Sequence, residues 1–315
     1  MKIVRKLFPA VIGVVAAAAI MYFVFRPGGP ARIQTGKQEG AVRTAAIRVV
    51  AAENFYGNVA SQLGGGLVSV KSLISSPNVD PHEYESTVED GIAVARADIV
   101  IKNGLHYDAW MDKMLSASPN PDRIVITAGD VAPSRLPANP HVWYGVDNME
   151  AVANAIDKAL IKVRPADAPF FKSSLARFLA SLAPVRAKEE GIRLKYKGSP
   201  VGLTETIGLY LTGPMGLRVL TPFEFQKAIA EGNDPPAASV AAADRQVDRK
   251  EIMILIYNRQ TVTPIITALL GKAWARGIPL VPVSETMPQG DTYQSWMLTG
   301  LGLIEKGLFS ARGGR

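Results

Sequence analysis

The sequence predicts an α/β protein of two lobes, each with a mainly parallel sheet flanked by helices, joined by a long rigid helix. Short apolar runs rich in Val and Ile alternate with segments of helical periodicity, which is typical of crossover units in parallel sheets. One long helical pattern, at residues 163–196, interrupts this alternation. The 315 residues also exceed a usual domain of about 100 to 200 residues. We therefore expect lobes at residues 46–162 and 197–315.

The first 45 residues predict an export signal or membrane anchor followed by a linker. Three basic residues within the first six positions precede a 19-residue apolar run at 7–25. Alanines at 16–19 offer a cleavage site, yet the apolar run continues beyond them, so a signal peptide and an uncleaved anchor both remain open. The polar, Gly-rich stretch 26–43 reads as a linker. We therefore expect a periplasmic protein, tethered to the inner membrane if the segment is retained.

The formal net charge of +7 belongs to this N-terminal region. Residues 1–50 hold eight Lys and Arg and one acid, which leaves 27 basic and 27 acidic residues in the rest of the chain. An electroneutral body argues against nucleic-acid binding. The chain has no Cys, which excludes disulfides, lipid attachment to Cys and thiolate metal sites.

The first lobe is expected to hold four strands with helices between them. The apolar runs that predict these strands are 47–51, 67–74, 98–101 and 123–126. Helical spacing of apolar residues follows the first strand and recurs around 87–95, 107–115 and 149–163. The connecting helix should kink at Pro184, because proline lacks a backbone donor and crowds the preceding turn.

The second lobe repeats the alternation of strands and helices. Its predicted strands are 201–204, 218–220, 253–257 and 279–283. Two such lobes create a cleft, and ligands in these folds bind beyond the carboxyl ends of the strands.

All three histidines of the chain lie in loops that follow predicted strands. His82 lies in Asp-Pro-His-Glu-Tyr-Glu (80–85) and His141 in Asn-Pro-His-Val-Trp (139–143). Histidines at strand ends are placed to be ligands, although a solvent-facing or turn-stabilising role is the alternative for each. For His106 we favour that alternative over an accessory ligand.

The two Pro-His motifs together resemble the paired signature of the metal-binding solute receptors of zinc and manganese ABC importers (cluster A-I or cluster 9 proteins). The similarity extends from residue 47 nearly to the C-terminus. It implies that His82 and His141 are metal ligands and that two loops of the second lobe complete the site. The matching positions are Glu205, with Thr204 as the alternative, and Asp291, with Glu285 as the nearby competitor. Asp291 is also well placed to cap a helix.

This ligand set is chemically coherent. Two neutral imidazoles and two carboxylates carry a charge of minus two, which balances a divalent cation and leaves little room for catalytic water. Mixed nitrogen and oxygen ligands suit Zn(II) or Mn(II), and the set does not decide between them.

The resemblance implies a non-enzymatic, monomeric receptor that captures Zn(II) or Mn(II) and delivers it to an ABC permease. A zinc hydrolase is one alternative, with Glu53 or Glu83 as its base, although HExxH, GxSxG and P-loop motifs are missing from the sequence. A receptor for an organic ligand is the other. A rigid connector predicts only a small closure of the cleft.

Overall fold

The computed structural model describes residues 45–76, 81 and 84–313. The predicted export segment and His82 lie outside the described residues. Within the described part of the chain, none of the helices combines the length and the apolar character needed to cross a bilayer.

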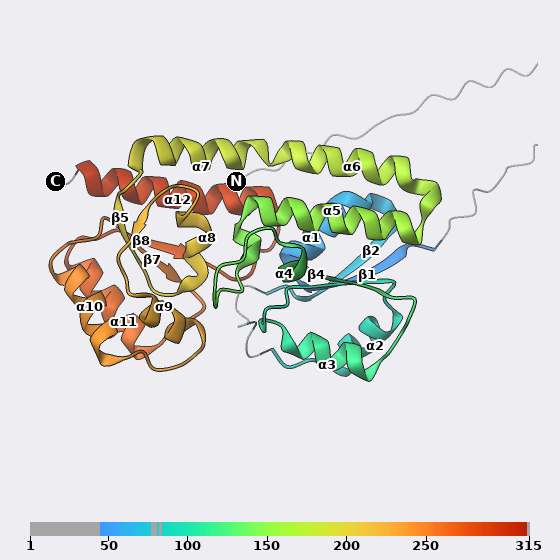
Figure 1. Ribbon diagram of the computed structural model, residues 1–315, viewed down its shortest axis with the longest axis horizontal. Coiled ribbons are helices and arrows are strands. Elements are labelled where there is room, and N and C mark those ends of the chain that lie inside the picture. The colour runs from blue at the N-terminus through green and yellow to red at the C-terminus, as the bar shows by residue number, and fades with distance from the viewer. Residues whose placement is uncertain (1–44, 77–80, 82–83, 314–315) are drawn as a thin grey trace, which may run out of the picture. The chain divides into compact units, whose positions relative to one another are not determined.

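The first sheet holds four parallel strands in the order β2-β1-β3-β4 (Figure 1). Their bounds are β1 (Ile47–Glu53), β2 (Val68–Ile74), β3 (Ile99–Lys102) and β4 (Ile124–Thr127). All four were predicted as strands, and their short apolar runs are what a sheet covered on both faces requires. The central strand β1 ends at Glu53, so the residues just beyond it lie at the carboxyl edge of the sheet.

Helices cover both faces of this sheet. They are α1 (Asn54–Gly64), α2 (Val88–Arg96), α3 (Ala109–Ala117), α4 (Ala128–Val131) and α5 (Val146–Val163), with the 3-10 turns η1 (Gly65–Leu67) and η3 (Val142–Tyr144). Side chains of β1 alternate between the faces: Val49 and Ala51 pack with α1 and α5, whereas Val50 packs with α2 and α3. This period of two follows from strand geometry.

Two consecutive helices, rather than one, connect the lobes. After the turn η4 (Pro165–Asp167), α6 (Ala168–Ser181) runs along the first lobe and α7 (Ala183–Tyr196) along the second (Figure 1). The interruption falls at Leu182, two residues before Pro184, as the missing donor of proline predicts. The final helix, α12 (Tyr293–Gly313), packs beside α7, where Glu305 accepts from both Lys188 and Lys195.

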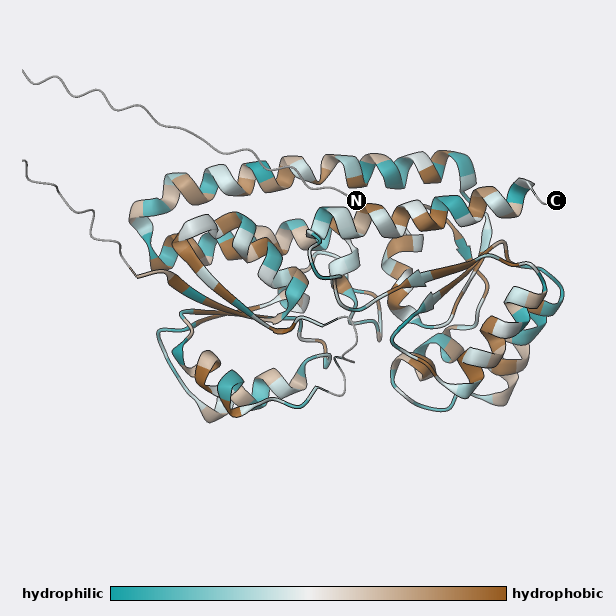
Figure 2. Ribbon diagram, turned by 180° about the vertical axis from the view of Figure 1, so that it is seen from behind, coloured by the Kyte–Doolittle hydropathy of each residue, from teal (hydrophilic) through white to brown (hydrophobic). Residues whose placement is uncertain are grey.

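The second sheet repeats the topology of the first, in the order β6-β5-β7-β8 with parallel pairing. Its strands are β5 (Pro200–Leu203), β6 (Arg218–Val219), β7 (Leu255–Asn258) and β8 (Leu280–Val283). The remaining elements are η5 (Thr206–Gly208), α8 (Leu209–Thr212), α9 (Phe223–Ala230), α10 (Ala237–Asp248) and α11 (Pro264–Ala275). Leu255 packs with α9, α10 and α11, whereas Ile256 joins the core shared with α7 and α12. Apolar residues accordingly concentrate on the strands and on the helix sides that face them (Figure 2).

One apolar core runs through both lobes. Phe55 of α1 stacks on Trp143 with ring centroids 4.7 Å apart and on Trp296 of α12 at 5.7 Å, and Tyr144 contacts Trp296 at 5.2 Å. The core contains buried residues of both sheets. Because packed interiors resist deformation, this interface opposes large rotation of one lobe against the other.

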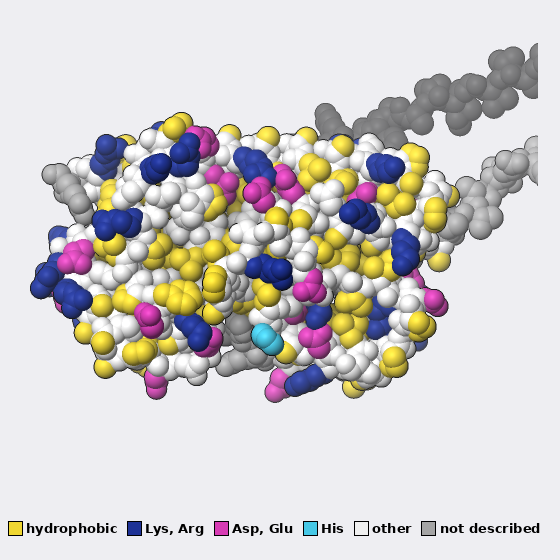
Figure 3. All heavy atoms as spheres, in the orientation of Figure 1, with side chains coloured by type: hydrophobic (Ala, Val, Ile, Leu, Met, Phe, Trp, Pro, Cys, Tyr) yellow, Lys and Arg dark blue, Asp and Glu magenta, His cyan; other side chains and the backbone are white. Residues whose placement is uncertain are grey.

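Charges on the described surface are mixed in sign. Lys and Arg side chains are interspersed with Asp and Glu over the face shown in Figure 3. The mixture on this face agrees with the electroneutral body that the sequence predicts.

Candidate metal centre

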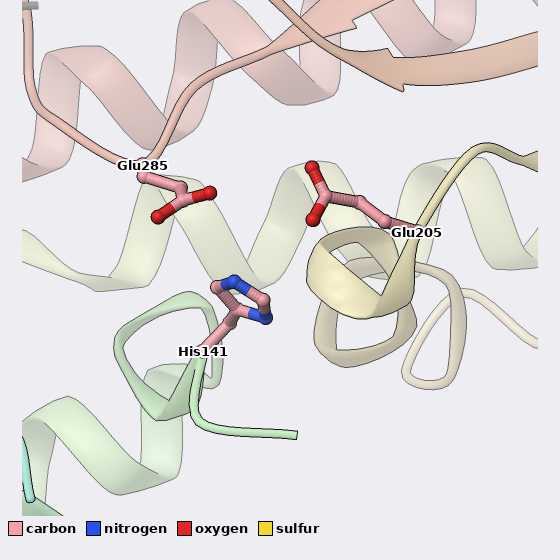
Figure 4. Close-up of side chains that lie close together, drawn as sticks. All are labelled: His141, Glu205 and Glu285. Carbon is pink, nitrogen blue, oxygen red and sulfur yellow. The ribbon is translucent and has the colours of Figure 1, made fainter. Parts of the chain in front are cut away.

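Three buried side chains from loops distant in sequence converge between the lobes. His141, Glu205 and Glu285 each offer one ligand atom, and these atoms lie within 4.8 Å of one another. The imidazole of His141 points between the two carboxylates (Figure 4). Glu205 follows β5 and Glu285 follows β8, so both acids lie beyond carboxyl ends of strands, where the topology predicts a ligand site.

His141 is oriented by its neighbour Asn139. The Oδ1 atom of Asn139 accepts from the backbone N–H of His141 at 3.0 Å and lies 2.8 Å from its Nδ1 atom. Because Oδ1 is an acceptor only, Nδ1 carries the proton and Nε2 keeps its lone pair. Nε2 is therefore the atom able to bind a cation. The amide of Asn139 also donates to the carbonyl of Thr206 at 2.8 Å, which ties this loop to the loop of Glu205.

Glu205 enters the centre directly from the sheet. It is 1% exposed and has extended backbone angles, φ −155° and ψ −177°, before the turn η5. Its Oε1 atom accepts from the hydroxyl of Thr261 at 3.3 Å. Thr204, the alternative to Glu205, instead accepts from the backbone N–H of Asn258 at 3.3 Å. The hydroxyl of Thr204 thus faces β7 and belongs to the sheet.

Glu285 is held by donors from both lobes. Its Oε1 atom accepts from Nδ2 of Asn258 at 2.6 Å, and its Oε2 atom accepts from the hydroxyl of Tyr107 at 2.8 Å. The backbone N–H of Glu285 donates to Oε1 of Gln260 at 2.6 Å. Such partners fix the orientation of a ligand and strengthen its metal binding.

A strained loop after β3 supplies Tyr107. Gly104, Leu105 and His106 have φ values of 74°, 56° and 66°, and the left-handed backbone costs a residue with a side chain about 1 to 3 kcal/mol. The buried carboxylate of Asp108 stabilises the turn by accepting from the backbone N–H groups of Asn103 and Gly104, at 2.6 and 2.8 Å. The loop thereby directs Tyr107 inward, whereas His106 is exposed.

Buried acids surround the centre. Glu53, at the end of β1, is fully buried, and its pKa is raised well above the usual range by burial and further by the charges of Asp108 and Glu285. Burial also raises the pKa of Tyr144, to which the charges of Glu285 and Glu205 contribute. An excess of buried negative charge is costly unless a cation neutralises it.

A cavity of about 700 Å³ leads to the partners of the three converging side chains. Its walls include Tyr107, Asn139 and Thr261, each hydrogen-bonded to one of them, together with His106 and Glu231. The cavity therefore borders the hydrogen-bond partners of the centre and not its three converging side chains themselves.

The structure brings together two of the four predicted ligands, His141 and Glu205, and places beside them the competitor of Asp291. Glu285, not Asp291, lies with them. Asp291 instead accepts from the hydroxyl of Ser295 at 2.9 Å, beside the start of α12. The side chain that accepts from a backbone N–H of this first turn is Thr292, which receives the N–H of Ser295 at 3.2 Å. Ligand residues in such folds lie just beyond the carboxyl ends of strands. This rule would have favoured Glu285, which follows the end of β8 by two residues, over Asp291, which comes later in the loop. His82 lies outside the described residues.

A family model described as zinc-uptake complex component A, periplasmic (ZnuA), matches residues 49–307. The chain is similar to the iron-binding protein YfeA of Yersinia pestis, with 26% identity over 152 residues that cover 45% of this chain and 49% of that protein. It is also similar to the manganese ABC transporter substrate-binding lipoprotein PsaA of Streptococcus anginosus, with 22% identity over 286 residues, 83% of this chain and 89% of PsaA.

Among solved structures, the periplasmic zinc-binding protein TroA from Treponema pallidum matches with a TM-score of 0.68 at 21% identity. The match covers 84% of this chain and 99% of TroA. This likeness confirms the predicted two-lobed fold.

Proposed function

Because the chain belongs to the zinc-uptake complex component A family, we propose that it is the substrate-binding protein of an ABC importer for a divalent transition metal. The observation that carries the proposal is the convergence of His141, Glu205 and Glu285 in a buried centre between the lobes. Each of these side chains is at most 2% exposed. A cation would offset the mutual repulsion of the two carboxylates and join loops of both lobes.

The proposed ligands are Nε2 of His141 and the carboxylates of Glu205 and Glu285, with His82 as the fourth. His82 is included on the strength of its Asp-Pro-His motif alone. Two neutral imidazoles and two carboxylates carry a charge of minus two, which balances a divalent ion. The names of relatives and structural neighbours mention iron, manganese and zinc. Zn(II) and Mn(II) both suit the mixed set of nitrogen and oxygen ligands.

A receptor explains the environment better than a hydrolase does. A metal hydrolase needs an open coordination position and an ionised base beside it. Glu53, one of the two acids considered for that role, is fully buried, and burial raises its pKa well above the usual range, which disfavours the ionised form that a base requires. Glu83, the other, lies outside the described residues. Tyr107 and Asn258 hold both oxygens of Glu285, as suits a positioned ligand.

Delivery to a permease and periplasmic location are parts of the same proposal. The basic and apolar N-terminal sequence supports export, and PsaA is named as a substrate-binding lipoprotein of a manganese ABC transporter. The rigid core between the lobes supports a small closure upon metal binding.

Calorimetric titration of the chelator-treated protein with Zn(II) and with Mn(II) tests the proposal. We expect one ion per chain for the wild type and a loss of at least a hundredfold in affinity for His141→Ala and Glu285→Gln. Asp291→Asn is the matched control, because its carboxylate lies outside the cluster, and it should bind as the wild type does. Equal binding by His141→Ala and the wild type would refute the site. Elemental analysis of protein purified from its native host would identify the physiological metal.

A further inference from the structure

A second cavity lies between the lobes, apart from the one beside the metal centre. Its volume is about 310 Å³, room for several waters or a small organic molecule. It lies where α7 passes the beginnings of α5 and α8 (Figure 1). Residues 145–148, which follow His141 in the chain, and residues between 209 and 214, which follow Glu205, contribute to its wall. Both lobes and the connector therefore contribute to this cavity.

Glu189 of α7 brings a buried carboxyl group to this cavity. The residue is only 7% exposed, and its Oε1 atom is buried without a hydrogen-bond partner among the described residues. A buried acceptor left without a donor destabilises the folded protein. A ligand that donates a hydrogen bond to Glu189 would remove this penalty.

The remaining charges of the wall leave an excess of acid. Arg186 lies one turn before Glu189, but its guanidinium is already shared by Asp147 at 2.6 Å and Glu150 at 2.7 Å. Burial raises the pKa of Glu189 to about 7, and Arg186 lowers it only in part. Arg135, whose charge acts on Tyr210 of the wall, is a second guanidinium nearby. Asp147 and Glu189 of the wall and Glu150 beside it still outnumber the two guanidiniums, which favours a cationic ligand over an anionic one.

Apolar side chains complete the wall. Leu136, Val146, Leu209 and Pro214 line it together with Tyr210. The hydroxyl oxygen of Tyr210 accepts from the backbone N–H of Leu136 at 2.8 Å, a further hydrogen bond between the lobes. A short hydrocarbon chain matches these surfaces, whereas a hydrated metal ion does not.

We propose that this cavity binds a small primary ammonium compound, whose NH₃⁺ group donates to Glu189 and whose short hydrocarbon chain contacts the apolar wall. The site would give the receptor an organic ligand in addition to its metal. No feature of the metal centre is needed for this binding. The test of this proposal is therefore independent of the function proposed above.

Three probes of equal chain length separate charge from apolar contact: n-butylammonium, n-butanol and n-butyrate. Each is titrated into the full-length protein at matched ionic strength and followed by NMR or calorimetry. We expect saturable millimolar binding of n-butylammonium, at least tenfold weaker binding of n-butanol and no saturable binding of n-butyrate. Equal binding of all three would show that the carboxyl group does not select the ligand, and the absence of saturable ammonium binding would show that the cavity holds solvent only; either result would overturn the proposal.

Glu189→Gln is the decisive variant, and Glu190→Gln is its control. Glu190 is the next residue of the same helix, but it is exposed and paired with Arg193 at 2.6 Å. We expect Glu189→Gln to weaken n-butylammonium binding at least tenfold and Glu190→Gln to leave it unchanged. Undiminished binding by Glu189→Gln would overturn the proposal. A structure of the wild-type complex gives a check independent of any variant, because the ligand nitrogen should lie about 3 Å from the Glu189 carboxyl group.

Discussion

Asn139 accepts the Nδ1 proton of His141 at 2.8 Å and, through its amide, donates to the carbonyl of Thr206 at 2.8 Å. One side chain thus sets the tautomer of the imidazole and fixes the distance between the loops of His141 and Glu205. Asn139 is 3% exposed, so solvent does not compete for these bonds. The orientation of the imidazole is therefore built into the protein before a metal binds.

Replacing Asn139 should weaken metal binding without removing a ligand. We expect Asn139→Ala to lower the affinity about 10- to 100-fold, as is usual when the outer partner of a metal-binding histidine is removed. Calorimetric titration of the metal measures the effect. Asn154→Ala is the control, because Asn154 donates to the carbonyl of Glu150 within α5. Wild-type affinity of Asn139→Ala would show that the imidazole needs no orientation by Asn139.

Removing the hydroxyl of Tyr107 should loosen Glu285. Tyr107→Phe keeps the ring contacts with His141 and Trp143, at centroid distances of 6.1 and 5.0 Å, but loses the 2.8 Å bond to Oε2 of Glu285. A hydrogen bond to a charged group contributes about 1.5 to 3 kcal/mol, so we expect about a tenfold or greater loss of metal affinity.

Tyr84→Phe is the matched control for this substitution. Tyr84 also donates to a carboxylate, that of Asp90 at 2.8 Å, but at the N-terminus of α2. The metal affinity of the Tyr84→Phe variant should equal that of the wild type. If both variants lost affinity equally, the loss for Tyr107→Phe could not be assigned to Glu285.

Neutralising Glu205 should weaken metal binding and stabilise the metal-free protein. The carboxylates of Glu205 and Glu285 converge in a buried space, where like charges repel strongly. Glu205→Gln should therefore raise the melting temperature of chelator-treated protein and abolish most of the increase that Zn(II) gives the wild type. Thermal unfolding with and without Zn(II) measures both effects. A lower melting temperature of the metal-free variant would contradict the repulsion argument.

Much of the fold was predictable because its signals are local. The runs that formed β1, β3, β4 and β8 are short and apolar, and Pro184 marked the break between α6 and α7. The metal centre was less predictable. His141 was predicted from its Asn-Pro-His motif, whereas Glu205 and Asp291 were both carried over from the resemblance, and the structure places Glu285 rather than Asp291 beside His141 and Glu205. The supporting bonds of Asn139 and Asn258 join loops far apart in sequence, and periodicity carries no signal for such contacts.

The lobes should move little when metal binds. Tyr293 donates to the carbonyl of Trp143 at 2.8 Å, and Asn54 exchanges two hydrogen bonds with the backbone of Met287, at 2.6 and 3.0 Å. These buried or half-buried bonds cross the interface beside the shared aromatic core. We expect X-ray scattering profiles of chelator-treated and metal-loaded protein to agree within about a few per cent in radius of gyration, whereas a large contraction would contradict a rigid interface.

Glu189 should make stability fall as the pH rises through neutrality. Burial raises its pKa from 4.5 to about 7, so between these values the folded protein binds a proton that the unfolded chain releases. This contribution is complete below pH 4.5 and is lost by about pH 7, amounting to about 3 kcal/mol. Glu189→Gln should therefore gain that much stability over the wild type at pH 8 and little at pH 4.5, as measured by urea unfolding.

The difference between wild type and variant isolates Glu189 from other titrating groups. Glu53 contributes with the same sign, because its pKa is also raised. Asp90 contributes with the opposite sign, since its pKa is lowered to about 2, and its stabilisation is lost only as the pH falls below about 4. Both groups are unchanged in Glu189→Gln and cancel in the comparison, and Glu190→Gln should show no such gain at pH 8. A pH-independent difference for Glu189→Gln would contradict a raised pKa of Glu189 in the folded protein.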